Sequence, residues 1–154
     1  MSNDFSEVQQ RFEGLITALS PSARLKLMRQ ISVDLAKNQR KRITAQQNPD
    51  GTTFAPRKIP LRRRKKQNRI KTKNKKMFSK IKSARFLKRT VTDNGLTIGY
   101  SGKISEIASM HQYGGIERHG KKVYHIPQRE ILGVSKEDKE LVEELIMINL
   151  LSNN

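Results

Sequence analysis

The sequence predicts an α+β fold in which helices begin and end the chain and a small antiparallel sheet lies between them. Three observations support this prediction. Apolar residues recur at helical spacing in the first 45 residues and again after position 135. A turn sequence typical of β-hairpins lies between two short apolar runs near position 94. Residues 52–76 follow neither pattern and predict a long basic loop.

The N-terminal region predicts a helical hairpin. The first helix, from about Asp4 to Leu19, has apolar residues at spacings of three and four: Phe5, Val8, Phe12, Leu15, Ile16 and Leu19. Ser20 and Pro21 then suit the cap and the first position of a second helix. The second helix ends near Gln47, and its stripe contains Leu25, Met28, Ile31 and Leu35. Because the break between the helices is short, we expect them to be antiparallel.

The segment after the second helix begins with a turn. In 48–51, Asn-Pro-Asp-Gly, proline fixes φ, aspartate bonds back to the backbone and glycine accepts positive φ. Apolar residues return at Met77, Phe78 and Ile81, where we expect a short helix that leads into a strand.

The clearest β signal follows this segment. The runs Phe86–Thr92 and Leu96–Tyr100 flank Asp93-Asn94-Gly95 and predict a hairpin. Lys103–Tyr113 then predicts a short helix that ends at Gly114 and Gly115.

The last third of the chain predicts one more strand and one more helix. Lys122–Ile126 reads as a strand that Pro127 stops. Ser135 caps the C-terminal helix, and Glu137 and Asp138 suit the positive end of its dipole. We therefore expect a single domain over residues 1–154, with 57–82 a basic arm between the helical hairpin and the sheet.

The positive charge of the protein is concentrated in one segment. The 154 residues include 32 Lys and Arg and 14 Asp and Glu. Between Arg57 and Arg89 there are seventeen basic residues and no acidic one, which leaves 15 basic against 14 acidic residues elsewhere. Such a block repels itself and does not compact without an anionic partner. The segment is therefore expected to meet phosphates or an acidic protein surface, unless it stays a solvated loop.

Three interpretations of the basic block stay open: contact with protein, contact with a nucleic-acid backbone, or solvation alone. Phe54 and Phe78 lie outside its densest run, Arg62–Lys76, which disfavours base stacking. The candidate contact residues are Arg62, Arg63, Arg64, Lys65, Lys66, Arg69, Lys71, Lys73, Lys75 and Lys76.

The sequence offers little for catalysis, so we expect no enzyme and no cofactor. There is no cysteine for a disulfide, a thiolate metal site or a nucleophile. The three histidines, His111, His119 and His125, lack the spacing of a metal site and have no carboxylate cluster beside them. No apolar run is long enough to span a bilayer, and the N-terminus does not read as a secretory signal. We expect the protein in a cytoplasm or in an assembly built there, with no membrane contact.

Several local signatures, taken in order, resemble the virion-morphogenesis or tail-completion proteins of Mu-like and related contractile-tailed bacteriophages. They lie in residues 5–24, 46–52, 54–57, 76–78, 96–99, 107–114 and 127–133. None of these signatures is specific alone, and their ordered combination carries the resemblance. The density of the Arg62–Lys76 run is the one departure from the family pattern, and it leaves the role of the arm open.

The resemblance implies a structural virion protein that completes the tail and helps to join it to the head. It implies a homo-oligomeric ring, commonly hexameric, in the neck of the virion, assembled in the host cytoplasm. The implied partners are the tail tube or terminator and the head-connector proteins, with contact to packaged DNA secondary. The alternative is a standalone basic nucleic-acid-binding protein, although no helix-turn-helix or aromatic RNA-binding strands are evident.

A second candidate surface lies at His111, Gln112 and Tyr113, where the predicted short helix meets glycine residues. Tyrosine and glutamine suit a subunit interface. The equally favoured interpretation is simple helix termination with Tyr113 packed in the core.

Overall fold

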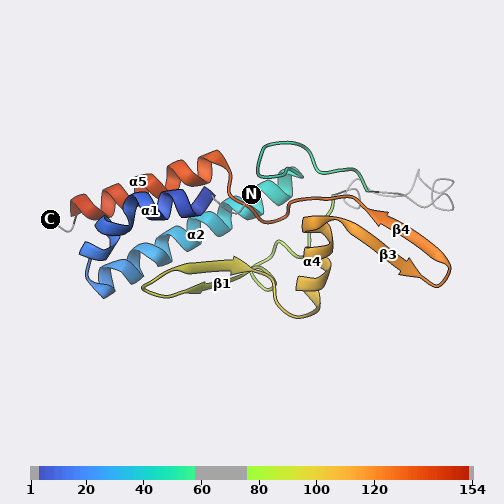
Figure 1. Cartoon of the computed structure of the whole chain (residues 1–154), viewed down its shortest axis with the longest axis horizontal. Coiled ribbons are helices and arrows are strands. Elements are labelled where there is room, and N and C mark those ends of the chain that lie inside the picture. The colour runs from blue at the N-terminus through green and yellow to red at the C-terminus, as the bar shows by residue number, and fades with distance from the viewer. Residues whose placement is uncertain (1–3, 58–75, 153–154) are drawn as a thin grey trace.

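The computed structural model describes residues 4–57 and 76–152 and confirms the α+β class (Figure 1). The elements, in chain order, are α1 (Asp4–Ala18), α2 (Pro21–Ala45), β1 (Lys88–Val91), β2 (Leu96–Gly99), α4 (Lys103–Tyr113), β3 (Gly115–His119), β4 (Lys122–Ile126) and α5 (Lys136–Ser152). The molecule is elongated: α1, α2 and α5 lie together at one end, and the β3–β4 hairpin projects at the other (Figure 1).

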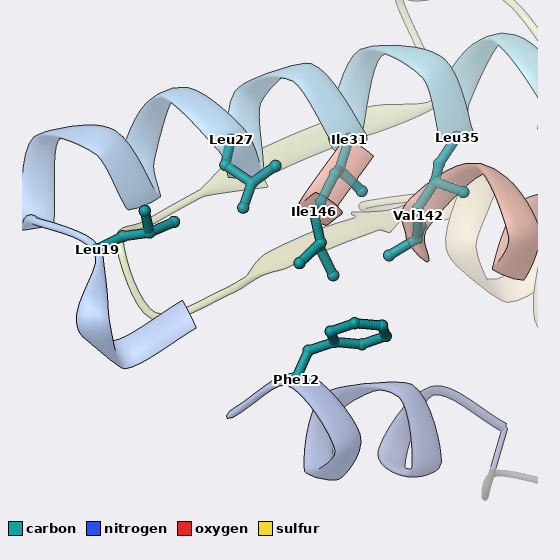
Figure 2. Close-up of a cluster of buried hydrophobic side chains, with 7 residues drawn as sticks. All are labelled: Phe12, Leu19, Leu27, Ile31, Leu35, Val142 and Ile146. Atoms are coloured by element: carbon teal, nitrogen blue, oxygen red, sulfur yellow. The ribbon is translucent and has the colours of Figure 1, made fainter. Parts of the chain in front are cut away.

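The helical end contains the larger hydrophobic core. Figure 2 shows side chains from α1, α2 and α5 that point toward one another. The buried members of this cluster are Phe12, Leu19, Leu27, Ile31, Leu35, Val142 and Ile146. On α2 they recur at spacings of four, so one stripe of that helix faces α5. The predicted helical hairpin is present, and the C-terminal helix completes its core.

The helix boundaries follow the predicted capping residues. The Ala23 amide donates to Ser20 Oγ at 3.3 Å, and Pro21 occupies the first turn of α2. At the start of α5, the Asp138 amide donates to Ser135 Oγ (3.2 Å) and the Ser135 amide donates to Asp138 Oδ2 (3.0 Å). This reciprocal arrangement is a capping box, and it satisfies two amides that would otherwise lack partners.

The β1–β2 hairpin forms around the predicted turn and packs on α2. Its strands are antiparallel, with Val91 opposite Leu96 and Lys88 opposite Gly99. Leu96 and Ile98 pack against the main core, and Arg89 Nη1 donates to Ser32 Oγ of α2 at 3.1 Å. The hairpin therefore covers a face of α2.

A smaller core lies where the distal part of α2 meets α4. Its buried residues are Ile43, Ala108 and Ile131, and Phe78, Ile81 and Tyr100 pack against them. Ile43 comes from the last turns of α2, so this one helix contributes to both cores. The second core holds the middle of the molecule together, between the helical end and the β3–β4 hairpin.

The structure differs from the sequence prediction at two places. Residues 77–87 form a series of turns rather than the expected short helix, with hydrogen bonds such as Lys82 N to Phe78 O (3.2 Å). The strand Gly115–His119 was not predicted, and it pairs with Lys122–Ile126 as a second hairpin rather than as part of one sheet. Gly120, at φ +59°, supplies the turn between them.

No helix within the described ranges is long and apolar enough to cross a membrane.

Candidate functional site

Two loops far apart in the sequence join in the middle of the molecule. The first, residues 46–57, follows α2, and the second, residues 127–135, precedes α5. The Glu130 amide donates to Asn48 Oδ1 at 2.9 Å, and a Cβ at Gly133 would lie only 2.3 Å from Pro49 Cγ. Only glycine fits at Gly133 unless Pro49 moves. We call these two loops the loop junction.

Arg129 is the buried centre of the loop junction. Its Nε donates to the Ala55 carbonyl (2.7 Å) and its Nη2 donates to the Pro56 carbonyl (3.1 Å). Its Nη1 lies 3.2 Å from the Pro127 carbonyl and 3.1 Å from His111 Nδ1. Burial lowers the pKa of Arg129, but three carbonyl acceptors stabilise its cationic form. One side chain thus fixes the chain just before the basic segment begins.

His111 connects the loop junction to the turns that follow the basic segment. Its ring packs edge-on against Phe78 at 4.9 Å between centroids, and Phe78 packs in the same way against Phe54 at 5.7 Å. Burial lowers the pKa of His111, the charge of Arg129 lowers it further, and Glu117 opposes both effects. A neutral imidazole can accept a hydrogen bond from Arg129 through Nδ1. The contacts indicate a structural role for the ring.

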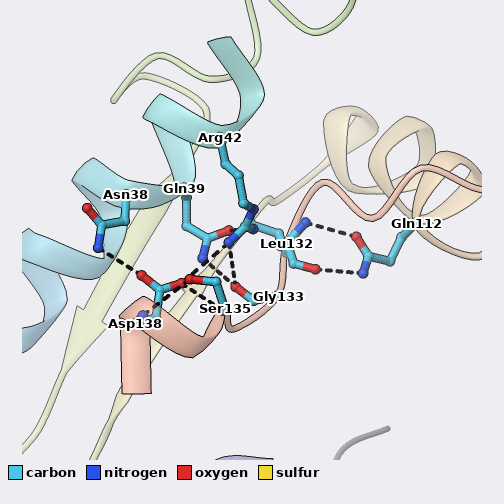
Figure 3. A network of polar contacts seen from close by, with 8 residues as sticks. All are labelled: Asn38, Gln39, Arg42, Gln112, Leu132, Gly133, Ser135 and Asp138. Atoms are coloured by element: carbon cyan, nitrogen blue, oxygen red, sulfur yellow. Dashed lines mark hydrogen bonds and ion pairs between the residues drawn. The ribbon is translucent and has the colours of Figure 1, made fainter. Parts of the chain in front are cut away.

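A polar network attaches the loop junction to the helices (Figure 3). Arg42 Nη1 lies 3.4 Å from Asp138 Oδ2 and donates to the Gly133 carbonyl at 3.2 Å. Gln39 Nε2 donates to the same carbonyl at 2.5 Å, and Asn38 Nδ2 donates to Asp138 Oδ1 at 2.8 Å. Burial lowers the pKa of Arg42, and the nearby carboxylate of Asp138 opposes this shift. The pair fixes the start of α5 against α2.

Gln112 belongs to the same structural unit. Its Nε2 donates to the Leu132 carbonyl at 2.7 Å, and its Oε1 accepts from the Leu132 amide at 2.9 Å (Figure 3). Both functional atoms of the amide are therefore used within the chain. Gln112 aligns the end of α4 with the second loop of the junction.

A groove lies beside the loop junction, between the turns at 76–81, α4 and the β3–β4 hairpin. Its walls include Arg57, Lys76, Phe78, His111, Tyr124 and Ile126. Arg57 and Lys76 are the described residues on either side of the segment 58–75, so the chain on both sides of that segment lies at this groove. The chain that follows the segment 58–75 is held by Gln46: its Nε2 donates to the Met77 carbonyl (2.9 Å), and its Oε1 accepts from the Met77 amide (2.7 Å). Lys76 Nζ also donates to the Thr44 carbonyl at 3.3 Å.

The predicted contact residues have different positions. Arg62, Arg63, Arg64, Lys65, Lys66, Arg69, Lys71, Lys73 and Lys75 lie outside the described residues. Lys76 lies at the edge of the groove. His111 is half-buried, Gln112 bonds to Leu132, and Tyr113 is 77% exposed. The core position considered for Tyr113 is therefore not observed.

Sequence reasoning missed the residues that hold this site together. Asp138 was expected at an exposed helix start, but it is fully buried beside Arg42. Arg129, 2% exposed, carried no signal that distinguishes it from a surface arginine. Both positions depend on partners more than 70 residues away. The described residues contain no group of histidine, cysteine and carboxylate side chains that could hold a metal ion.

Comparison with known proteins identifies the class. The chain belongs to the phage virion morphogenesis family, whose model matches residues 3–151. It is also similar to tail completion protein S of Escherichia phage P2, at 40% identity over 152 residues that cover 96% of this chain and 98% of the relative. No solved structure matches the chain significantly. It is a structural protein of phage tail completion rather than an enzyme.

At least four of the segments that suggested this family meet at the loop junction, whereas residues 5–24 and 96–99 belong to the helical end and to β2. Residues 46–57, 76–78, 107–114 and 127–133 are separate in the sequence, yet they contact one another through Arg129, His111, Gln112 and Asn48. These segments thus form one connected unit, and this unit holds the chain on both sides of the segment 58–75.

Proposed function

We propose that this protein is a subunit of a homo-oligomeric ring, hexameric by the family resemblance, that completes the phage tail and helps to join it to the head. The end-to-end match to a tail completion protein carries this proposal. The partners would be the tail tube or terminator and the head-connector proteins. After assembly, the protein would be located in the neck of the virion. The exposed apolar residues at both ends of the chain support a subunit that buries surface on assembly.

Within this function, we infer that the segment 57–82 is an assembly arm. Its contact residues would be Arg62–Lys76, on acidic protein surfaces first and on the DNA backbone second. The arm would act from a fixed base, since Arg129 holds the chain before it at Ala55 and Pro56, and Gln46 holds Met77 just after the Arg62–Lys76 run. A fixed base at both ends lowers the entropy lost when the arm binds.

Of the second candidate surface, His111, Gln112 and Tyr113, we infer that Tyr113 makes the subunit contact. Gln112 is occupied by Leu132, and His111 packs against Phe78 and Arg129. Tyr113 is the exposed member of the three, and an exposed tyrosine next to Gly114 suits a subunit contact. His111 and Gln112 would then position this contact from inside.

The proposed function is tested by deleting the gene from the phage or prophage that encodes it. We expect electron micrographs of lysates to show separate heads and tails, and the wild-type gene in trans to restore joined particles. Infectious particles with normal necks in the absence of the protein would overturn the proposal.

The arm is tested in the same complementation assay with Lys and Arg in 62–75 replaced by Gln. A control variant carries changes to Gln at Lys26, Arg29, Lys37 and Lys41, exposed basic residues of α2. We expect loss of joined particles only for the arm variant. Equal performance of the two variants would show that the segment has no special role.

DNA binding is the second candidate function, and the density of the basic run favours it. Binding to a short duplex would weaken steeply with salt, because each neutralised phosphate releases counterions. Mass photometry at low and high salt, with and without duplex, distinguishes the two functions. Discrete rings without DNA support the structural proposal, whereas a monomer that only binds duplex favours the alternative.

A further inference from the structure

The groove beside the loop junction has apolar walls that are open to solvent. Its volume is about 910 Å³, at the upper end of the range of roughly 300–1,000 Å³ that is usual for binding clefts. Ile107 of α4 and Val123 and Tyr124 of β4 line it, and each of them is about half exposed. Large apolar side chains that gather at one exposed surface are typical of an interaction site.

The charged residues of the groove make it positive. Arg57, Lys76 and Lys80 line it and are exposed. Among the described residues that line it, Glu117 is the sole acid, and its Oε1 lies 2.9 Å from His119 Nε2. An anionic partner would therefore meet three exposed cations here and one carboxylate that is already engaged within the chain.

One wall of the groove contains a strained residue. Phe78 has a φ of +61°, in the left-handed region that a bulky side chain rarely adopts. Its edge-on contacts with the rings of Phe54 and His111 hold it there. Backbone strain that the surrounding packing maintains is frequent at binding sites. Because these rings fix Phe78, the turns at 76–81 present a preformed wall to a partner.

The chemistry of the walls favours a protein over a nucleic acid as this partner. Protein–DNA interfaces are more polar than protein–protein interfaces. A phosphate backbone could meet the cations, but it offers no apolar side chain to the walls. A polypeptide with acidic and apolar side chains matches both features. Four further apolar residues line the groove: Met77, Phe78, Ile81 and Ile126.

The loops of a second copy of this chain do not supply such a segment. All but four of the 14 acidic residues lie in α1, α2, α4 and α5. The other four stand apart in the sequence, and each contacts a residue of its own chain: Asp50, Asp93, Glu117 and Glu130. The segment is therefore expected to come from a different protein.

We propose that the groove binds an acidic segment of another virion protein, with apolar side chains of that segment on the walls and its carboxylates near the three cations. The groove adjoins the chain on both sides of the segment 58–75. A partner that the proposed assembly arm attracts would thus be close to a second site, at which shape and apolar contact add specificity. The inference rests on the tail-completion function proposed above, which supplies the other virion proteins.

Peptide binding to the purified full-length protein tests the groove. The probe is a fluorescent peptide of alternating glutamate and leucine, and fluorescence anisotropy measures its Kd. We expect Ile107→Glu to weaken binding several-fold, because it places a carboxylate on an apolar wall. The matched control is Ile116→Glu, since Ile107 is 50% and Ile116 56% exposed, and Ile116 lies on β3 away from the groove walls. Equal affinities of the two variants overturn the inference.

Charge reversal gives a second test in which no apolar residue is changed. Lys80→Glu should also weaken peptide binding several-fold. Lys88→Glu is its control, because Lys88 is likewise exposed but lies on β1, outside the groove. Equal losses from the two changes would contradict the proposed site.

The basic arm could bind an acidic peptide by charge alone, so it needs its own control. In the variant with Gln in place of Lys and Arg in 62–75, Ile107→Glu should still weaken peptide binding. Loss of all binding in the arm variant would assign the contact to the arm and overturn the inference. A short DNA duplex that binds more tightly than the peptide, and that Ile107→Glu weakens, would identify nucleic acid as the occupant and also overturn it.

Complementation in the phage separates this inference from the proposed function. We expect Ile107→Glu to reduce joined particles and Ile116→Glu to support them. A photo-cross-linking residue at position 107 in assembled tails should join this chain to an acidic segment of another virion protein, identified by mass spectrometry. Cross-links to a second copy, or joined particles at the wild-type level with Ile107→Glu, overturn the inference alone. Normal infectious particles without the protein overturn the proposed function, whereas the peptide measurement still decides whether the groove binds.

Discussion

The two ends of this molecule differ in how many apolar side chains they bury. The helical end buries seven apolar residues between α1, α2 and α5, and β1–β2 covers a further face of α2. No residue of the projecting β3–β4 hairpin is buried. Apolar burial is the main stabilising term in folding, so the helical end carries the stability of the domain. The difference teaches that side-chain burial stabilises the helical end, whereas the hairpin relies on strand pairing and on its attachment to the rest of the fold.

Truncation in the main core should have the largest effect on this comparison. Leu27 is fully buried, and Leu27→Ala should lower the free energy of unfolding by about 4 kcal/mol through lost burial and a residual cavity. Urea denaturation followed by circular dichroism measures it. Val123→Ala in the hairpin should change stability by no more than about 0.5 kcal/mol. Similar losses from the two changes would contradict the division between the ends.

Removing the buried carboxylate should come next in size. Asp138→Ala leaves Arg42 buried without its counter-ion and removes the acceptor of Asn38, so we expect a loss of about 3 kcal/mol. Asp138→Asn keeps the shape and should cost less. The same urea titration checks both variants, and a loss below that of an exposed substitution such as Glu144→Ala would show that the network is not structural.

Adding a single methyl group at Gly133 tests how tightly the loop junction is packed. Gly133→Ala places a Cβ against Pro49 and should destabilise the protein by about 2 kcal/mol through overpacking. Gly115→Ala is the matched control, because nothing lies within 4 Å of a Cβ there. Thermal unfolding should show a lower Tm for the first variant only. Equal shifts would mean that the contact with Pro49 relaxes freely.

The smallest expected effect is the pH dependence that comes from His111. Burial and Arg129 lower its pKa in the folded state, so near pH 6 the unfolded chain binds more protons than the folded chain at this residue. Stability should therefore fall as pH drops below 6.5, until the folded-state pKa is passed. His111→Asn keeps an acceptor for Arg129 without titrating there. Unfolding at pH 7.5 and 5.5 should show a smaller loss for this variant, and an equal loss would contradict the prediction.

The elements with local causes could be predicted from the sequence. Apolar spacing located α1, α2 and α5, and Ser20 and Ser135 marked two helix starts. The β1–β2 hairpin followed from its turn residues. The chain from 115 to 119 offers Ile116 as its single apolar side chain, so no alternation announced β3. Residues 77–87 have apolar content suited to a helix, but they form turns, and Phe78 packs against the rings of Phe54 and His111.

The candidate site was harder to predict, because its residues act through distant partners. Tyr113 was proposed from its type and its place at a helix end, and the structure shows that it is exposed, while its role as a contact stays a prediction. Arg129 was noticed only as part of a family segment, since nothing in its neighbours indicates burial among carbonyls of residues 55, 56 and 127. Asp138 suits an exposed helix start equally well. The burial of Arg129 and Asp138 depends on partners far away in the sequence, and local sequence patterns do not reveal such partners.

The separation of the loop junction from the exposed β3–β4 hairpin has a consequence for how chains with this fold can vary. Several of the signature segments meet at the loop junction, whereas the β3–β4 hairpin projects away from it and has no buried residue (Figure 1). Two chains with this fold can therefore share the buried residues of the loop junction and still differ at the exposed residues of the hairpin. Exchanging the exposed hairpin residues between two such chains should change this surface without redesign of either core, because the hairpin contributes no buried residue to them.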